Sequence, residues 1–348
     1  MTDDPQEGMS EFDAEQVISD LRQALHRAHS QVRAARDRNA ELVRVTHQAA
    51  YDAMMAQGPI PQVRPPNRDR RRKGTPEVAV WDMGDWQGSK RTVSYDTPTM
   101  QRRVLQFTEK AELLTSIHRA DHPVRKAALI FGGDMVEGLF NFPTQAFEID
   151  ATLHEQYVVV SRLIVEVIRR ALSIYEHVTV VPEWGNHGRI GSKRDAVPRS
   201  DNIDRMCFTL AREILTAAGE GNRLTFPDSP EDIQRLEIGN YRALVMHGDE
   251  VGRNGFASPA TIVRHVTAWQ SGAYPWEFRD CYVHHYHQHM EFPLPNGRGS
   301  VFFTGSTESD NRYARDQMAS AALPSQRLHF IEPDKGFVTS QHKIVLAT

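Results

Sequence analysis

One stretch decides the fold: Ala127-Ala128-Leu129-Ile130-Phe131-Gly132-Gly133-Asp134, a short apolar run that ends in two glycines and an aspartate. A run of this length, bounded by glycine, is typical of a strand that is buried on both faces. Similar runs recur along the chain and alternate with longer segments of helical periodicity. Strands alternating with helices predict an α/β fold, built in layers around a substantial sheet.

Six strands and three helices are predicted in this part of the chain. Short apolar runs predict strands at Glu77–Trp81, Ala127–Phe131, Val178–Val181, Ala243–Met246, Cys281–His284 and Val301–Thr304. Apolar residues in 3-4 spacing predict helices over Met100–Ile117, Leu153–Tyr175 and Ile203–Ala218. We therefore expect one large domain over residues 76–348.

The first 57 residues predict a long helix. No Pro or Gly occurs between Phe12 and Met55. Apolar or small residues recur there in heptad register, with one polar residue among them, at Ile18, Leu21, Leu25, Ala28, Val32, Ala35, Asn39 and Leu42. Such a pattern favours a coiled coil, and hence a homodimer formed through residues 12–55. A single amphipathic helix packed on its own domain is the alternative.

Residues 58–75 form a predicted linker rich in proline and arginine. The prolines at 59, 61, 65 and 66 end the helix, because proline removes a backbone donor and clashes with the preceding turn. The same stretch contains six basic residues, Arg64, Arg68, Arg70, Arg71, Arg72 and Lys73. They form either a solvated tether or a contact for nucleic-acid phosphates.

Composition excludes several classes of protein. Of the 348 residues, 40% are hydrophobic and 25% charged, which is an ordinary globular balance. No apolar run approaches the roughly 20 residues of a membrane-spanning helix. The acidic start Met1-Thr2-Asp3-Asp4 lacks a signal-peptide pattern, and two cysteines form no disulfide framework. We expect a cytoplasmic protein without a membrane partner.

Polar residues that a core would not accept fall just after the predicted strands. They are Asp85 and Gln87, Asp134, Asn186 and His187, His247, and then His285 and His287. Because the carboxyl ends of strands in layered α/β folds form a ligand crevice, these side chains can converge on one site. Carboxylate combined with imidazole suits Mn²⁺, Fe or Zn²⁺ better than Ca²⁺ or Mg²⁺.

In their order, these motifs resemble the calcineurin-like metallophosphoesterases. The five blocks D-x-H, G-D-x-x-(D/E), G-N-H, H and G-H-x-H find counterparts between Glu77 and about Ser306. Residues 138–145 and Asp201-Asn202 are similar to a phage-encoded subgroup related to recombination-repair nucleases. The resemblance implies a four-layer α/β/β/α sandwich with two divalent metals, Mn²⁺ first and Fe, Zn²⁺ or Mg²⁺ as alternatives. If the chain is phage-encoded, the location is the host cytoplasm.

The resemblance also implies a role for each residue. Asp85, Gln87 and His287 would hold the first metal, and Asp134 would bridge both metals. Asn186, His247 and His285 would complete the second. His187 would act as general acid on the leaving oxygen or stabilise the transition state.

Three departures from the family pattern and two other alignments are visible. Gln87 replaces a histidine, His284 replaces a glycine before His285, and Gly188 replaces an acidic residue after His187. The first block could instead be Asp82-Met83-Gly84, and the last pair His287-Gln288-His289. We prefer Asp85, because Gly88 and the helix opened by Arg102-Arg103 follow it as in the family, and His285-His287, because that pair lies directly at a strand end.

The expected function is metal-dependent phosphoester hydrolysis, most simply a nuclease acting on DNA. Two cations bind phosphate oxygens and lower the pKa of a bridging water. Arg189, Lys193, Arg194 and Arg199 either contact substrate phosphates or form a solvated loop, and Glu137 is expected to orient a ligand rather than to be one. The alternatives are a phosphodiesterase or phosphatase for a nucleotide or other small phosphoester, and a non-catalytic scaffold.

Overall fold

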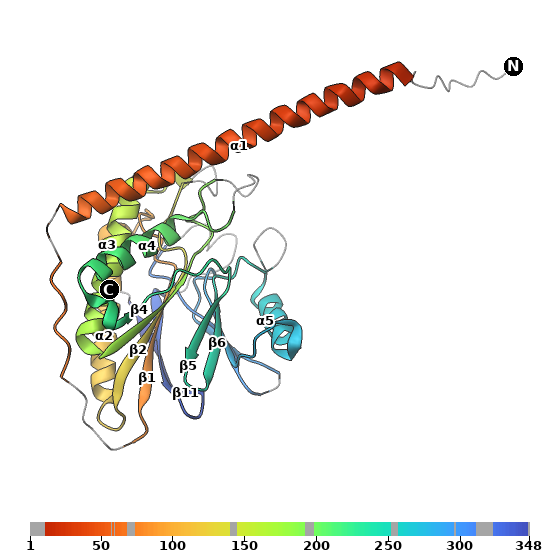
Figure 1. Cartoon of the computed structure of the whole chain (residues 1–348). Coiled ribbons are helices and arrows are strands. Elements are labelled where there is room, and N and C mark those ends of the chain that lie inside the picture. Colours follow the sequence, from red (N-terminus) through yellow and green to blue (C-terminus); the bar gives the residue numbers. More distant parts are fainter. Residues whose placement is uncertain are drawn as a thin grey trace. The chain divides into compact units, whose positions relative to one another are not determined.

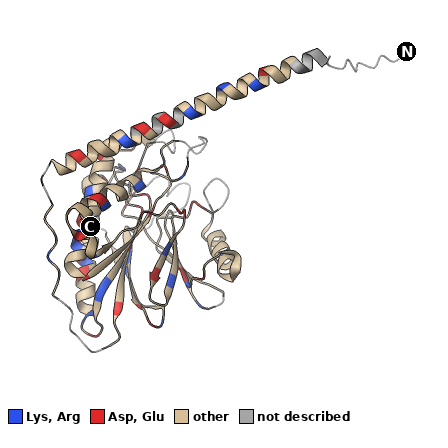
Figure 2. Cartoon of the chain, in the orientation of Figure 1, with Lys and Arg blue, Asp and Glu red and all other residues tan. Residues whose placement is uncertain are grey.

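The computed structural model describes residues 11–56, 58, 60–67, 74–139, 145–191, 198–251, 257–295, 297–310 and 323–346. The chain divides into two units, residues 1–49 and 50–348. The long helix α1 spans Glu11–Met55, and most of its residues belong to the first unit. Charged residues of both signs are interspersed along it (Figure 2). This is typical of a helix whose surface is exposed to water.

The second unit contains two β-sheets (Figure 1). The larger sheet has the strand order β11-β10-β1-β2-β3-β4. Its strands are β1 (Glu77–Met83), β2 (Val124–Gly132), β3 (His177–Glu183), β4 (Leu224–Thr225), β10 (Ser325–Glu332) and β11 (Phe337–Val345). Strands β1 to β4 pair in parallel, whereas β10 pairs antiparallel with β1 and with β11.

The smaller sheet has the order β5-β6-β7-β9-β8. Its strands are β5 (Gln234–Ile238), β6 (Tyr241–Met246), β7 (Asp280–Val283), β8 (Met290–Pro293) and β9 (Ser300–Phe303). Strands β6, β7 and β9 pair in parallel, and the outer two are antiparallel. Both sheets therefore have parallel centres, whose carboxyl ends carry the predicted site residues.

The two sheets pack face to face over a shared apolar core. Val80 and Ile130 of the larger sheet belong to the same buried cluster as Val245 and Tyr282 of the smaller one. Helices α2 (Thr97–His118), α3 (Leu153–Ile174) and α4 (Ile203–Ala217) cover the outer face of the larger sheet, and α5 (Pro259–Ala268) covers that of the smaller (Figure 1). The predicted four-layer α/β/β/α sandwich is confirmed.

The helices of the second unit begin at side chains that cap their free N–H groups. Asp96, Asn202 and Ser258 each accept from a backbone N–H in the first turn of α2, α4 and α5. Thr152 and Glu155 form a reciprocal capping box at α3. Short helical turns lie at Gln145–Phe147, Glu220–Asn222 and Trp269–Ala273. None of the described helices is long and apolar enough to cross a membrane.

All six predicted strands and three predicted helices are present, with ends displaced by up to three residues. The prediction missed β4, β5, β8, β10, β11 and α5. Strand β10 shows why, since every residue of it is buried although Gln326, Arg327 and His329 are polar. Arg327 donates to the carbonyls of Met290 and Phe303. Partners so distant in sequence are invisible to a local hydropathy pattern.

Candidate metal centre

Five loops meet at one edge of the sandwich. They follow β1, β2, β3, β6 and β7, and each carries predicted ligands. Parallel pairing within each sheet brings the carboxyl ends together, and face-to-face packing joins the two edges. The clearest link is between His247 of the smaller sheet and Asp134 of the larger, whose Nε2 and Oδ2 atoms are 3.1 Å apart.

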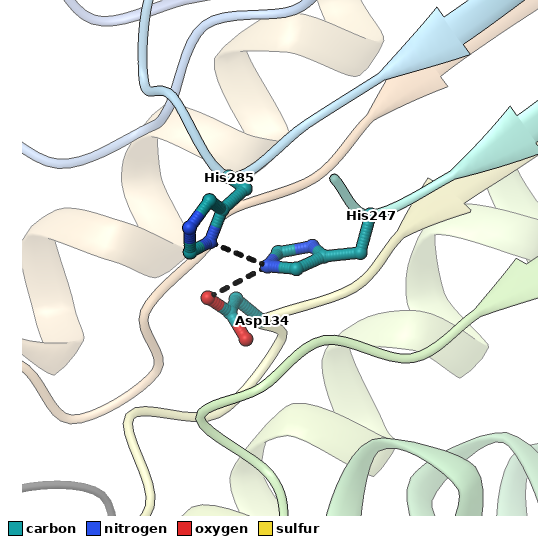
Figure 3. A group of neighbouring side chains, drawn as sticks. All are labelled: Asp134, His247 and His285. Carbon is teal, nitrogen blue, oxygen red and sulfur yellow. Dashed lines mark hydrogen bonds and ion pairs between the residues drawn. The ribbon is translucent and has the colours of Figure 1, made fainter. Parts of the chain in front are cut away.

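Asp134, His247 and His285 form the centre of this site (Figure 3). His285 Nδ1 lies 3.2 Å from His247 Nε2, which in turn faces the Asp134 carboxylate. One ligand atom from each of the three residues falls within 4.8 Å of the others. For a cation about 2.1 Å from each ligand, neighbouring ligand atoms lie roughly 3.0 to 3.4 Å apart. The cluster therefore matches the spacing of a metal site.

The imidazole of His247 is oriented by the backbone. Its Nδ1 lies 2.8 Å from the carbonyl of Gly132, which can only accept, so that Nδ1 carries the hydrogen. Its Nε2 faces Asp134 Oδ2 and, at 3.2 Å, Asn186 Oδ1. Metal-binding histidines commonly donate their other N–H in this way, which fixes the tautomer. Nε2 of His247 is therefore directed at a position where several lone pairs converge.

A second group of ligands lies on the other side of Asp134. His287 Nε2 is 3.5 Å from Asp85 Oδ1 and 3.3 Å from Gln87 Nε2. Gln87 Nε2 also lies 3.3 Å from Asp134 Oδ2, which joins the two groups. Among the described residues, the buried atoms Asp85 Oδ1 and Gln87 Oε1 have no hydrogen-bond partner. Buried oxygens of this kind are costly unless a cation or a donor binds them.

The backbone of the candidate ligands is held in an unusual conformation. Five of them have positive φ: Asp85 (48°), Gln87 (47°), Asp134 (50°), His285 (73°) and His287 (55°). Only two other described non-glycine residues do so, Ser89 and Asp310. The left-handed region disfavours side chains, and such strain concentrates at functional sites. The loops therefore hold these side chains in place through a strained backbone, which lowers local stability.

Glycines allow the ligand loops to approach each other. A Cβ added to Gly185 would lie 2.0 Å from Asp134 Oδ1, and one added to Gly133 would lie 2.5 Å from the backbone nitrogen of Gly185. A side chain at Gly185 would displace the shared carboxylate, and one at Gly133 would displace the backbone of Gly185. The Gly-Gly-Asp and Gly-Asn-His motifs are therefore coupled through direct packing.

His187 lies beside the centre, on an acidic support. Its Nδ1 is 3.2 Å from Glu137 Oε2, and its Nε2 is 3.8 Å from Asp134 Oδ2. Burial alone would lower the pKa of His187, but Asp134 and Glu137 raise it to about 9. Lys90 Nζ in turn contacts Glu137 at 3.1 Å. Glu137 therefore orients His187, and the imidazole holds its proton at neutral pH.

The predicted phosphate-binding arginines have acidic partners in the structure. Arg189 lies 2.5 Å from Asp249, and Arg199 contacts Asp249 and Glu250 at 2.8 and 2.6 Å. Arg199 also donates to the carbonyl of Trp184, so it ties the loop after β6 to the loop after β3. The structure thus places these side chains in a support for the ligand loops. Lys193 and Arg194 lie outside the described residues.

The alternative ligands have other partners. Asp82 is fully buried and contacts His284 Nε2 at 2.9 Å and the hydroxyl of Thr304. Burial and the charges of Arg327 and Lys343 lower the pKa of His289 to about 3. Neither Asp82 nor His289 contacts the shared carboxylate. The geometry agrees with the preference for Asp85 and for the pair His285-His287.

Two departures from the family pattern have a packing explanation. The ring of His284 occupies space left open by Gly84 and Gly132, since a Cβ at either would lie within 2.4 Å of it. A Cβ at Gly188 would meet the side-chain oxygen of Asn202 at 2.3 Å. His284 and Gly188 are therefore accommodated without any change at the candidate ligands.

Sequence reasoning missed two supporting carboxylates. Glu308 Oε2 lies 3.2 Å from His287 Nδ1, which leaves Nε2 of that ring facing Asp85. Asp204 accepts from the backbone N–H groups of Val136 and Gly185, which fixes both motifs around Asp134. Burial, with the Asp134 charge, raises the pKa of Asp204 to about 7. The only local signal for Glu308 is an acidic residue shortly after a predicted strand.

Comparison with known proteins yields weak structural likenesses. No protein-family model matches the sequence, and no curated protein matches it. Vps29 from Entamoeba histolytica, solved with zinc, is 11% identical with a TM-score of 0.35, covering 77% of this chain and 99% of its own. A hypothetical protein from Pyrococcus horikoshii is 13% identical (TM-score 0.38, covering 77% and 88%).

A third solved structure is a protein from Streptococcus pneumoniae, named as a predicted phosphoesterase. It is 11% identical, with a TM-score of 0.30, and the match covers 78% of this chain and 99% of that one. Scores this low assign neither a family nor an activity to the present chain. Its chemistry is inferred below from its own side chains.

The donor set fits divalent cations. Oxygen atoms of Asp85, Gln87, Asp134 and Asn186 are combined with imidazole nitrogens of three histidines. Mixed oxygen and nitrogen shells suit Mn²⁺, Fe and Zn²⁺. Two adjacent groups share Asp134, and in the group around Asp85 the buried Gln87 Oε1 has no hydrogen-bond partner among the described residues, whereas Asp85 Oδ1 faces His287 Nε2 at 3.5 Å. The site therefore suits a divalent cation at Asp134, His247 and His285.

Metal affinity should depend steeply on pH. Burial alone would lower the pKa of an imidazole. At His247 the charge of Asp134 overcomes this effect and raises the pKa, and at His287 the charges of Asp85 and Glu308 raise the pKa to about 10. His287 is then protonated at neutral pH in the metal-free protein, and the raised pKa of His247 favours its protonated form. Binding through Nε2 expels these protons, so affinity for Mn²⁺ should rise with pH, by up to about a hundredfold per unit between pH 6 and 8.

Isothermal titration calorimetry in buffers of different ionisation enthalpy measures the protons released. We expect about two for the unmodified protein and one fewer for His287→Asn. An affinity that does not change with pH would contradict the assignment of both imidazoles.

Substitution of Glu308 should weaken metal binding without removing a ligand. Glu308→Gln keeps the shape of the side chain but removes the charge that supports His287. The expected loss in Mn²⁺ affinity is about 10- to 100-fold. Glu237→Gln, on an exposed position of β5, is the matched control and should bind Mn²⁺ normally. Equal affinities of the two variants would show that Glu308 does not act on the centre.

Proposed function

We propose that this protein is a two-metal-dependent phosphoester hydrolase of the calcineurin-like metallophosphoesterase type. The observation that carries the proposal is the buried Asp134 carboxylate, shared by the group Asn186, His247 and His285 and the group Asp85, Gln87 and His287. The order of the sequence motifs and the two-sheet sandwich support the same assignment.

Each residue has a defined task in this proposal. A pair of bound cations would polarise a phosphoester and supply a hydroxide at neutral pH. The two groups of ligands would hold the cations, and Asp134 contacts members of both groups. The loops around Gly133 and Gly185 keep that carboxylate in place, and Glu308 and the Gly132 carbonyl orient His287 and His247.

His187 is suited to act as the general acid. In the metal-free protein the charges of Asp134 and Glu137 raise its pKa, and its Nδ1 is anchored on Glu137, so Nε2 faces the centre. A proton at Nε2 can pass to the leaving oxygen as the P–O bond breaks. The imidazolium also attracts the negative charge that develops on the phosphate.

We propose DNA as the substrate, cleaved as a phosphodiester. Support comes from the basic linker, of which Arg64 is exposed while residues 68–73 lie outside the described residues. Clustered cations supply most non-specific affinity for nucleic acid. The likeness of residues 138–145 and Asp201-Asn202 to phage-type repair nucleases points the same way. Asn202 caps α4 and donates to the carbonyl of Gly185, and residues 140–144 are not described.

A small phosphoester, such as a nucleotide, is the second candidate substrate. The net charge of −4 gives no general attraction for a polyanion. Of the arginines after the Gly-Asn-His motif, the two that the structure describes form ion pairs with Asp249 and Glu250. Both substrates require the same two-metal chemistry.

Two substitutions test the proposed chemistry. Asp134→Asn should reduce Mn²⁺-dependent hydrolysis of bis-p-nitrophenyl phosphate by at least about a thousandfold, because both cations depend on that carboxylate. His187→Ala should slow turnover about 100- to 10,000-fold while Mn²⁺ binding persists. Turnover by Asp134→Asn at the unmodified rate would disprove the two-metal proposal, and loss of metal in His187→Ala would reassign that residue.

The same assay, run beside labelled single- and double-stranded DNA, separates the substrates. Hydrolysis of the ester and of DNA supports a nuclease. Hydrolysis of the ester alone supports a small substrate. Inactivity on both would leave only a scaffold role.

We further propose that α1 pairs with α1 of a second copy of this chain. Its seam residues Ile18, Leu21, Leu25 and Val32 are 43–64% exposed and follow heptad spacing. The side chains of Ala35, Asn39 and Leu42 lie outside the described ones. Large apolar side chains repeated along one face of a helix are typical of a coiled-coil interface.

Charged substitutions on the seam test this pairing. The double variant Leu21→Glu/Leu25→Glu should be monomeric in light scattering after size exclusion, whereas the unmodified chain should be dimeric. Val45→Glu, an equally exposed position outside the seam, is the control and should remain dimeric. A monomeric unmodified chain would contradict the proposal.

A further inference from the structure

A small hollow lies beside the candidate metal centre. Its volume is about 280 Å³, and its walls are residues 90–93, Phe147, Glu148 and Asp310. Pockets for whole small-molecule ligands usually span about 300 to 1,000 Å³. The hollow is therefore of a size for one ring system of a larger ligand.

Two large apolar side chains that line this hollow are exposed to solvent. Phe147 and Val93 are each 87% exposed, the highest values among the exposed large apolar side chains that the structure describes. A single exposed apolar residue needs no explanation, but these two line the same hollow. The π-face of Phe147 is therefore available to a planar ligand.

The walls of the hollow are rigidly connected. The N–H of Arg91 donates to the carbonyl of Glu148, and Lys90 pairs with Ile149 in an isolated bridge. The hydroxyl of Thr92 donates to the carbonyl of Ser309 at 2.8 Å, next to Asp310. The segment that carries the aromatic ring is thus tied to the neighbouring wall at Glu148 and Ile149.

The same walls support the candidate metal centre. Lys90 lies between Glu148 and Glu137, and Glu137 orients His187. Asp310 follows two residues after Glu308, which orients His287. A group bound in the hollow is therefore adjacent to Lys90, which contacts Glu137 beside the general acid, and lies close in sequence to Glu308, which orients one metal ligand.

The charges of the hollow leave one cation available. Lys90 is neutralised by its two glutamates, and Asp310 accepts a hydrogen bond from Ser94. Among the described residues, the exposed Arg91 guanidinium has no hydrogen-bond or ion-pair partner. Arg91 can therefore take a phosphate, while the Asp310 carboxylate can accept from the amino or imino hydrogens of a base.

We propose that this hollow is a subsite for one unpaired nucleobase of a single-stranded DNA substrate, with the base stacked on Phe147 and a flanking phosphate on Arg91. The inference rests on the proposed phosphoesterase function and specifies its substrate. Stacking of bases on aromatic side chains, combined with cations that follow the backbone, is how single strands are bound without a fixed sequence. A base inside a duplex is already stacked and does not present its face to Phe147.

The test compares two strands of equal length, oligothymidylate and the same strand with abasic sugars in place of the nucleosides. Affinity is measured by fluorescence anisotropy in the full-length His187→Ala background with Mn²⁺, so that turnover is slow. Phe147→Ala should weaken binding of oligothymidylate about 5- to 100-fold and change binding of the abasic strand by less than about twofold.

Three further variants complete the test. Phe147→Trp keeps an aromatic face and should bind oligothymidylate nearly as well as the parent. Leu113→Ala removes another exposed apolar side chain, on α2, and should change nothing. Arg91→Ala should weaken both strands alike, because phosphate contacts are independent of the base.

Several outcomes would overturn the inference. Equal losses for both strands in Phe147→Ala, or no loss for either, would exclude base stacking. Competition by thymidine monophosphate at equal nucleotide concentration would assign the hollow to a free nucleotide. Metal-dependent hydrolysis of bis-p-nitrophenyl phosphate without base-dependent binding would reject this subsite alone. Base-dependent binding without any hydrolysis would support the subsite and reject the proposed function.

Discussion

The buried carboxylate of Asp134 is the constraint on which the site depends. Only 1% of the residue is exposed, and a buried charge is costly unless it is paired. Its burial would raise its pKa, but the charges of His247 and His187 hold that pKa well below its ordinary value. The anion therefore requires cations around it, which are imidazolium protons in the metal-free protein and metal ions in the proposed one.

The supports of this carboxylate extend through the surrounding loops. Glu137 and Lys90 hold His187, Glu308 holds His287, and Arg199 ties the loop after β3 to the loop after β6. Most of these contacts are charged pairs that are largely withdrawn from water, so removal of one partner leaves the other uncompensated. The positive φ values of the ligands persist because this network determines their conformation from several sides.

In the proposed function, the metal centre and the hollow beside it contact different parts of the substrate. In that proposal, metal ions and His187 would act on a phosphate, which every nucleotide carries, whereas Phe147 would contact the base. Lys90 belongs to both, since it lines the hollow and contacts Glu137. This shared support gives a physical route by which occupation of the hollow could affect the position of the general acid.

The sequence by itself determined the α/β class, the central parallel strands and the polar residues that follow them, because each is a local pattern of apolar runs and glycines. It did not determine β10, where Arg327 is buried against carbonyls from β9 and the start of β8. Nor did it determine Glu308 or Asp204, whose partners are distant in sequence. Only the tertiary structure decided which acids and bases face each other, because hydrogen bonds and ion pairs depend on distance in space and not on spacing along the chain.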